Sequence, residues 1–229
     1  MKHLYDLHIH SGLSPCANDD MTPANIIAAA SLKGLEIIAI SDHNSIKNVK
    51  LTIEIGKLLD ILVVPAIELQ TNEDIHFLCL FETFCDLEDF YNSITFTSLE
   101  NKSEVFGNQF IYDEDDNILE EKTLLATSAK ISERELIKLA TDHNGITIPA
   151  HIDRDCCGIL AVLGDIPKGY TSLELSGKNA QLIAQYSDNY NLIFNSDAHT
   201  LQDIGKTMGS IELQSLSIKS LLDFLRSKK

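Results

Sequence analysis

Short apolar runs that alternate with helical patterns are the feature that most restricts the fold of this 229-residue chain. The runs at residues 36–40, 61–67 and 146–150 are almost continuously apolar, which is typical of strands covered on both faces. Such strands occur in parallel sheets, where helices return the chain between neighbouring strands. The alternation therefore predicts an α/β fold, and the length suits a single (β/α) barrel domain over residues 1–229.

The remaining elements follow from the same patterns. Further strands are predicted at residues 3–8, 75–80, 172–175, 192–195 and 210–213. Thr22 and Pro23 suit the N-cap and first turn of a helix that ends at Gly34. Ser132 and Glu135 have the spacing of a capping box, which predicts a helix that ends near residues 144–145. Other helices are predicted at residues 45–59, 177–189 and 217–228.

Residues 84–130 interrupt this alternation. The stretch contains a helical pattern, a polar segment and the acidic run at residues 113–116. We interpret it as an insertion on the rim of the barrel. It is either a lid over the site or a solvated excursion without a role of its own.

Charge and composition exclude some classes of protein. The formal net charge of −16 disfavours a non-specific nucleic-acid binder, although bound metal ions can still attract an anionic substrate. The N-terminal residues lack the apolar run and cleavage site of a secretory signal, so we expect none, and no apolar run is long enough to span a membrane. Its odd number of cysteines, five, argues against a disulfide framework. We therefore expect a cytoplasmic protein with neither a membrane nor a nucleic-acid polymer as its partner, while the oligomeric state is not indicated.

Side chains that bind metals follow the carboxyl ends of several predicted strands. In (β/α) barrels the active site lies at that end, whatever the reaction. His8 and His10 are two residues apart on an extended segment, so both imidazoles lie on one face and can reach one ion. The other strand-end candidates are His43, Glu68, His151, Asp197 and His199. Imidazole and carboxylate ligands together suit Zn, Mn or Fe.

Five motifs along the chain resemble those of the polymerase and histidinol phosphatase (PHP) superfamily. They are DLHIH at residues 6–10, SDHN at 41–44, PAIEL at 65–69 with the later His76, PAHIDR at 149–154 and NSDAH at 195–199. They occur in the order of the family and span nearly the whole chain. The resemblance implies a distorted (β/α)7 TIM-like barrel, two or three divalent metal ions and hydrolysis of phosphate esters.

The resemblance also implies a set of ligands. One ion would take His8, His10, Glu68 and Asp197, and a second would take Glu68, His76 and His151, with Glu68 as the bridge. A third would take His43, His199 and one residue of the loop that follows the first motif. This loop departs from the family pattern and offers Cys16, Asp19 or Asp20. A Cys16 thiolate would favour Zn, whereas either aspartate would favour a harder ion such as Mn.

The implied mechanism is attack of a metal-activated hydroxide on phosphorus. Either His199 or His43 would protonate the leaving group, if it is not fully used by a third ion. Arg154 would hold the substrate phosphate through paired hydrogen bonds, or it forms a rim ion pair with a neighbouring aspartate. Lys178 is a second candidate for phosphate binding.

Three functions fit these residues. The first is a phosphoesterase that acts on a small phosphorylated metabolite, a nucleotide or a compound like histidinol phosphate. The second is a metal-dependent amide or carbonyl hydrolase of the amidohydrolase type, because similar ligands on a similar barrel serve that chemistry. The third is a non-catalytic binding module that metal ions stabilise.

Overall fold

The computed structural model describes residues 1–115, 117–177 and 179–227. The strands are β1 (Lys2–Ile9), β2 (Ile37–Ile40), β3 (Leu62–Val63), β4 (Ala66–Gln70), β5 (His76–Leu80), β6 (Phe110–Tyr112), β7 (Ile118–Glu120), β8 (Ile146–Pro149), β9 (Ser172–Leu175), β10 (Asn191–Phe194) and β11 (Gly209–Glu212). The helices are α1 (Pro23–Leu32), α2 (Val49–Leu58), α3 (Phe84–Asn92), α4 (Ser103–Phe106), α5 (Glu133–Asp142), α6 (Ile159–Leu163), α7 (Ala180–Tyr186) and α8 (Ile218–Arg226).

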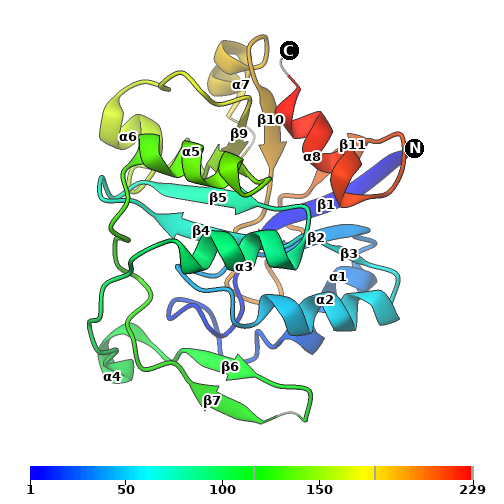
Figure 1. The fold of residues 1–229 in the computed structure, drawn as a ribbon. Helices are drawn as coiled ribbons and strands as arrows, with labels where there is room; N and C mark the ends of the chain where they lie inside the picture. The colour runs from blue at the N-terminus through cyan, green and yellow to red at the C-terminus, as the bar shows by residue number, and fades with distance from the viewer. Residues whose placement is uncertain (116, 178, 228–229) are drawn as a thin grey trace.

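Three sheets follow one another in space, with the order β11-β1-β2-β3, β4-β5-β8 and β9-β10 (Figure 1). Single contacts cross the gaps between them. Isolated bridges pair Ile9 with Ala198 and His43 with Glu68, and the N–H of Ile152 donates to the carbonyl of Glu174 at 2.9 Å. Within the described residues, ladders do not join these sheets into one closed barrel. The fold is mixed α/β, and the seven-stranded barrel stays a prediction.

Strand direction differs from the all-parallel arrangement that the alternation indicates. β1, β2 and β3 are parallel, as are β9 and β10, but β5 is antiparallel to both β4 and β8, and β11 is antiparallel to β1. The cause is local for β5. A tight turn returns the chain directly from β4, with the N–H of Thr71 donating to the carbonyl of Ile75 at 3.0 Å and Asp74 at a φ of +61°.

The predicted strand at residues 61–67 is two strands. Pro65 lies between β3 and β4, where its missing N–H cannot contribute to a ladder. β3 pairs with β2, whereas β4 pairs with β5. Glu68 therefore lies inside β4, opposite Leu78, and not beyond the end of a strand as expected.

The helix caps explain which helix boundaries are confirmed. Thr22 caps α1, and Ser132 with Glu135 forms the capping box of α5. The helix expected at residues 45–59 begins later, at Val49, and the Asn48 side chain before it bonds to Ser11 and to β6 and does not cap α2. The helix expected at residues 177–189 is shorter, because Asn179 is the N-cap of α7.

Both faces of β1 are buried, and this is what places the polar residues inside. Tyr5, Leu7 and Ile9 pack in apolar clusters, while His8 on the alternate face is equally inaccessible. A strand of this kind has no solvent-facing side, so its polar residues need partners within the protein.

Residues 84–130 form α3, α4 and the β6–β7 hairpin, and the hairpin packs on the loop that follows β1. The N–H of Phe110 donates to the carbonyl of Gly12 at 2.7 Å, and the Tyr112 hydroxyl donates to the carbonyl of Asp19 at 3.0 Å. A side chain at position 12 would meet the Tyr112 hydroxyl at 2.5 Å, so any residue larger than glycine would displace Tyr112. Among the described residues, no helix is long and apolar enough to cross a membrane.

Candidate metal centre

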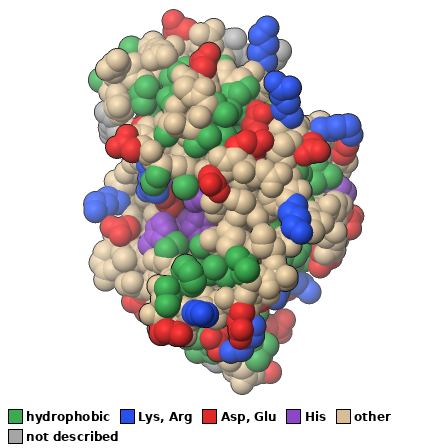
Figure 2. All heavy atoms as spheres, turned by 90° about the vertical axis from the view of Figure 1, so that its left-hand side faces the viewer, with side chains coloured by type: hydrophobic (Ala, Val, Ile, Leu, Met, Phe, Trp, Pro, Cys, Tyr) green, Lys and Arg blue, Asp and Glu red, His purple; other side chains and the backbone are tan. Residues whose placement is uncertain are grey.

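The Glu68 carboxylate lies at the centre of a cluster of histidines from separate elements. Figure 2 shows histidine side chains gathered in one place on the face at the left of Figure 1. The ring nitrogens within 3.4 Å of the carboxylate are His8 Nε2 (3.3 Å), His10 Nε2 (3.4 Å), His43 Nδ1 (2.9 Å), His76 Nδ1 (3.0 Å) and His151 Nε2 (3.2 Å). The structure thus brings together residues that are up to 143 positions apart (151 − 8).

The cluster contains three groups of residues that could hold an ion, and within each group the potential ligand atoms lie within 4.8 Å of one another. They are His8, His10 and Asp197; His43, Glu68 and His76; and His10, His43 and His199. The first group resembles the first implied ion site. His43 lies near Glu68 and His76 as well as near His199, so the second and third implied sites are adjacent.

Strand-end backbone geometry directs several of these side chains inward. Asp197 has a φ of +49° and His151 a φ of +30°, a region that residues other than glycine seldom adopt. His151 follows β8 after one residue, and Asp197 follows β10 after two residues. The backbone therefore turns sharply just beyond the end of each strand. Such backbone strain is concentrated at functional sites.

The donors and acceptors of the cluster fit cations better than hydrogen bonds. His8 Nε2 and His10 Nε2 lie 3.2 Å apart, and both are close to Asp197 Oδ1, at 3.3 and 2.9 Å. Glu68 Oε2 accepts no hydrogen bond among the described residues, although His43 Nδ1 lies 2.9 Å away. Imidazole nitrogens and carboxylate oxygens that converge in this way from separate elements are the donor set of a metal site.

The electrostatics of the cluster are those of strongly coupled groups. Burial alone would raise the pKa of Glu68, but the surrounding His76, His8 and His43 hold it well below its usual range. Burial lowers the pKa of His10 to about 3, so this imidazole is neutral and its ring can offer a lone pair. A charged carboxylate beside a neutral imidazole suits a divalent cation.

Cys16 lies beside the outer pair of histidines. Burial would raise the pKa of its thiol, but the nearby His199 and His43 lower this pKa to about 6. Asp19 points elsewhere, because its carboxylate accepts from Asn108 Nδ2 at 2.9 Å. Of the alternatives that the loop offers for a third ion, the structure brings Cys16 to His43 and His199.

Glu174 is a buried residue of this centre that the sequence interpretation missed. Its carboxylate lies 3.0 Å from His8 Nδ1 and accepts from the N–H of His151 at 2.9 Å and from Asn195 Nδ2 at 2.8 Å. Because a carboxylate only accepts, His8 Nδ1 carries the proton and Nε2 faces the cluster. The available signal was a charged residue between two leucines in the short strand β9.

Asp6 bonds mainly outside its own strand, although its Oδ1 also accepts from the backbone N–H of His8 at 3.5 Å. It accepts from the N–H of Ser196 at 3.0 Å and from the N–H of Gly205 at 2.8 Å. These bonds hold the loop that carries Asp197 and His199. Asp6 therefore positions the far side of the cluster.

The candidates for phosphate binding lie in different situations. Arg154 Nη1 is 2.5 Å from Asp197 Oδ2, so its ion pair is with the cluster and not with the neighbouring aspartate at 153 or 155. Lys178 lies outside the described residues.

Two of the histidines lie outside the cluster. His143 is the C-cap residue of α5, and His3 Nδ1 contacts Glu36 at 3.0 Å.

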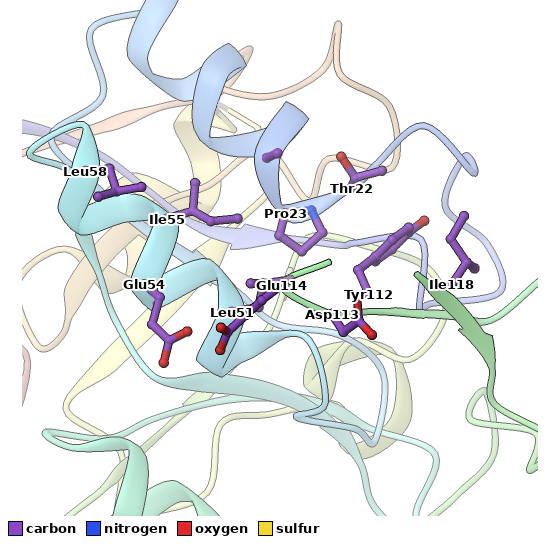
Figure 3. A pocket seen from close by; sticks show the side chains of 11 residues that line it. Thr22, Pro23, Leu51, Glu54, Ile55, Leu58, Tyr112, Asp113, Glu114 and Ile118 are labelled. Atoms are coloured by element: carbon purple, nitrogen blue, oxygen red, sulfur yellow. The ribbon is translucent and has the colours of Figure 1, made fainter. Parts of the chain in front are cut away.

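A cavity of about 470 Å³ lies elsewhere, between α1, α2 and the β6–β7 hairpin (Figure 3). Its lining includes Pro23, Leu51, Ile55 and Ile118, and it contains no histidine. The cavity is lined by both apolar side chains and carboxylates, Glu54, Asp113 and Glu114, and does not belong to the metal centre.

A family model described as the PHP domain matches residues 6–156, which is more than half of the chain. The chain therefore belongs to the PHP domain family. This family uses divalent metal ions and includes metal-dependent phosphoesterases. The NSDAH motif lies beyond the matched span. No curated protein sequence matches the chain significantly.

Solved structures of similar fold include enzymes with different substrates. The lesion-specific endonuclease Q of Pyrococcus furiosus is 18% identical with a TM-score of 0.75, and the match covers 99% of this chain and 56% of that one. A metal-dependent phosphoesterase from Bifidobacterium adolescentis is 15% identical with a TM-score of 0.59, over 85% and 87% of the two chains. An amidohydrolase from Chromobacterium violaceum is 14% identical with a TM-score of 0.56, over 93% of each chain.

The expectation that a nucleic-acid polymer is an improbable partner is wrong. Endonuclease Q in complex with a 27-mer duplex that has an abasic lesion at the active site matches 100% of this chain and 58% of that one, with 17% identity and a TM-score of 0.69. Net charge is a poor guide here, because it describes the whole surface and not the mouth of one site. This chain spans a little over half the length of endonuclease Q.

Proposed function

We propose that the protein hydrolyses phosphate esters with two or three divalent ions held by the histidine–carboxylate cluster. The observation that carries this proposal is the convergence of five imidazoles on the single buried carboxylate of Glu68. Glu68 would bridge two ions, and His8, His10 and Asp197 would complete one of them. His76 and His151 would serve the second, and His43, His199 and Cys16 the third.

When bound, the ions would supply a water of lowered pKa and positive charge opposite the phosphoryl oxygens. The chain supplies the remaining steps. With only two ions bound, His43 and His199 would not be ligands and either could donate a proton. His199 is the more accessible of the two, with 28% of its side chain exposed against 11% for His43, so it is better placed to protonate the leaving group. Arg154, with 40% of its side chain exposed, holds the phosphate at the mouth of the site.

The substrate class that we propose is a nucleic-acid strand, cut at a phosphodiester. The support is the similarity of the whole described fold to endonuclease Q, whose complex holds duplex DNA with an abasic lesion. Residues 84–130 lie beside the loop that carries Cys16, where an insertion would contact the strand. The chain as a whole is acidic, so its surface does not supply positive charge for a nucleic-acid strand. Arg154 and the ions would neutralise the phosphates bound at the site.

Strand cleavage tests the proposal directly. A labelled duplex with one abasic site, the same undamaged duplex and a phosphate monoester are incubated with the protein and Mn²⁺, Zn²⁺ or Mg²⁺. Cleavage at or beside the lesion supports the proposal. Turnover of the monoester alone would remove nucleic acid as the substrate, and turnover of cyclic amides alone would favour the amidohydrolase alternative.

Replacement of Arg154 by alanine is expected to raise KM for the cleaved strand by about tenfold, with kcat little changed, because a charged hydrogen bond to phosphate is lost. Steady-state kinetics measure both constants. Arg134→Ala is the matched control, since Arg134 is exposed on α5. Equal KM values for the two variants would assign Arg154 to the ion pair with Asp197 alone.

A further inference from the structure

Asp42 is a completely buried carboxylate next to His43, and the proposed function gives it no role. Its side chain bonds to the loop that follows β1. Asp42 Oδ1 accepts from the N–H of Ser11 and from the hydroxyl of Ser14, each at 2.7 Å. Asp42 Oδ2 accepts from the hydroxyl of Ser11 at 2.6 Å.

The hydroxyl of Ser11 is fully used. It donates to Asp42 Oδ2 and accepts from the N–H of Leu13 at 3.2 Å and from Asn48 Nδ2 at 2.8 Å. A serine hydroxyl has one proton and two lone pairs, so Ser11 has nothing left to offer Asp42 Oδ1 through its side chain. The hydroxyl proton that reaches Asp42 Oδ1 is therefore that of Ser14.

The same count fixes the partner of His10. The Ser14 hydroxyl gives its proton to Asp42 and accepts the backbone N–H of His43 at 3.1 Å. Its remaining lone pair faces His10 Nδ1 at 2.9 Å. Because Ser14 has no second proton, His10 Nδ1 has to donate this bond. All of these side chains except that of His43 have no exposed surface, which leaves little room for water to alter the count.

We infer that Asp42 and Ser14 form a relay that holds His10 in the tautomer with the proton on Nδ1. His10 Nε2 then offers a lone pair, 2.9 Å from Asp197 Oδ1 and 3.2 Å from His8 Nε2. Ser14 is thus a positioning residue, which acts on the metal centre through His10. The value of the relay to metal binding rests on the proposed function, but the tautomer itself does not.

Ser14→Ala removes the relay, and Ser41→Ala provides a matched control. Ser41 is also completely buried and adjoins Asp42, yet its hydroxyl makes no hydrogen bond among the described residues. Long-range ¹H–¹⁵N spectra of ¹⁵N-histidine-labelled full-length protein, recorded near pH 8 with a chelator, report which ring nitrogen of His10 carries the proton. Zinc titrations of the same samples report affinity.

The wild type and Ser41→Ala are expected to show a proton on His10 Nδ1 and an unprotonated Nε2. Ser14→Ala is expected to show a mixture of tautomers and zinc affinity about 10–100-fold weaker than Ser41→Ala. A proton on Nε2 in the wild type would overturn the inference without any variant. The inference can therefore be tested even if the Ser14→Ala protein fails to fold. Equal zinc affinities of two folded variants would also overturn it. Absence of zinc binding in the wild type, with the expected tautomer, contradicts only the proposed function.

Discussion

Glu68→Gln is expected to lower the rate of phosphate ester hydrolysis by on the order of a thousandfold and to reduce the bound metal. Glutamine has almost the shape of glutamate, but it carries no charge and turns two N–H donors toward ring nitrogens that lie 2.9–3.4 Å away. Without the bridging carboxylate, neither of two neighbouring ions keeps its full set of ligands. Turnover and elemental analysis of the purified variant measure the two effects.

Glu88→Gln makes the same chemical change on the exposed side of α3 and provides the control. It is expected to behave as the wild type, because an exposed carboxylate without a partner contributes little. Near-normal turnover in Glu68→Gln would remove Glu68 from the centre, however close the histidines lie.

Glu174→Gln is expected to affect both stability and metal binding. The carboxylate receives donors from His8, His151 and Asn195, and an amide group would turn N–H toward at least one of them. The unfolding free energy should fall by about 1–3 kcal/mol, the cost of a buried donor left without an acceptor. Metal affinity should fall by about 10–100-fold, because His8 loses the partner that fixes its ring.

Urea unfolding with a chelator present separates the first effect from the second. Glu212→Gln, on the exposed side of β11, is the control for the charge change alone. Unchanged stability of Glu174→Gln under these conditions would show that the carboxylate is not needed to satisfy the donors around it.

The strand-end candidates could be predicted from the sequence because two simple periodicities govern them. Alternation along β1 places His8 and His10 on one face, and apolar runs mark where other strands end. The structure brings His43, His151 and His199 to the same place. Their roles as ligands stay a proposal, and so does the rim insertion at residues 84–130.

The pairing of β5 could not be derived from apolar runs alone. A run of apolar residues suits a parallel strand and an antiparallel one equally, so the turn residues must decide. The segment Thr71–Asn72–Glu73–Asp74 has the composition of a tight turn, and it returns β5 antiparallel to β4. The turn composition of this segment therefore predicts a hairpin more directly than the alternation of strands and helices predicts a parallel pair.

Glu174 and Ser14 were missed for a different reason. Neither stands at the end of a strand beside another ligand type, and their importance depends on partners far away in sequence, such as His8 for Glu174 and Asp42 for Ser14. Hydrogen bonds of this kind follow from burial, because a polar group without water needs a protein partner. A charged residue in a strand that is covered on both faces is the signal that sequence offers.

Elemental analysis of the full-length protein, expressed with Zn, Mn and Fe supplied, is the most direct measurement of the convergence of side chains on cations. The three groups of ligand atoms lead us to expect about two or three equivalents of transition metal per chain, with most of it lost in Glu68→Gln. A metal-free wild type that also fails to take up any of these ions on titration would contradict the metal centre and, with it, the proposed hydrolysis.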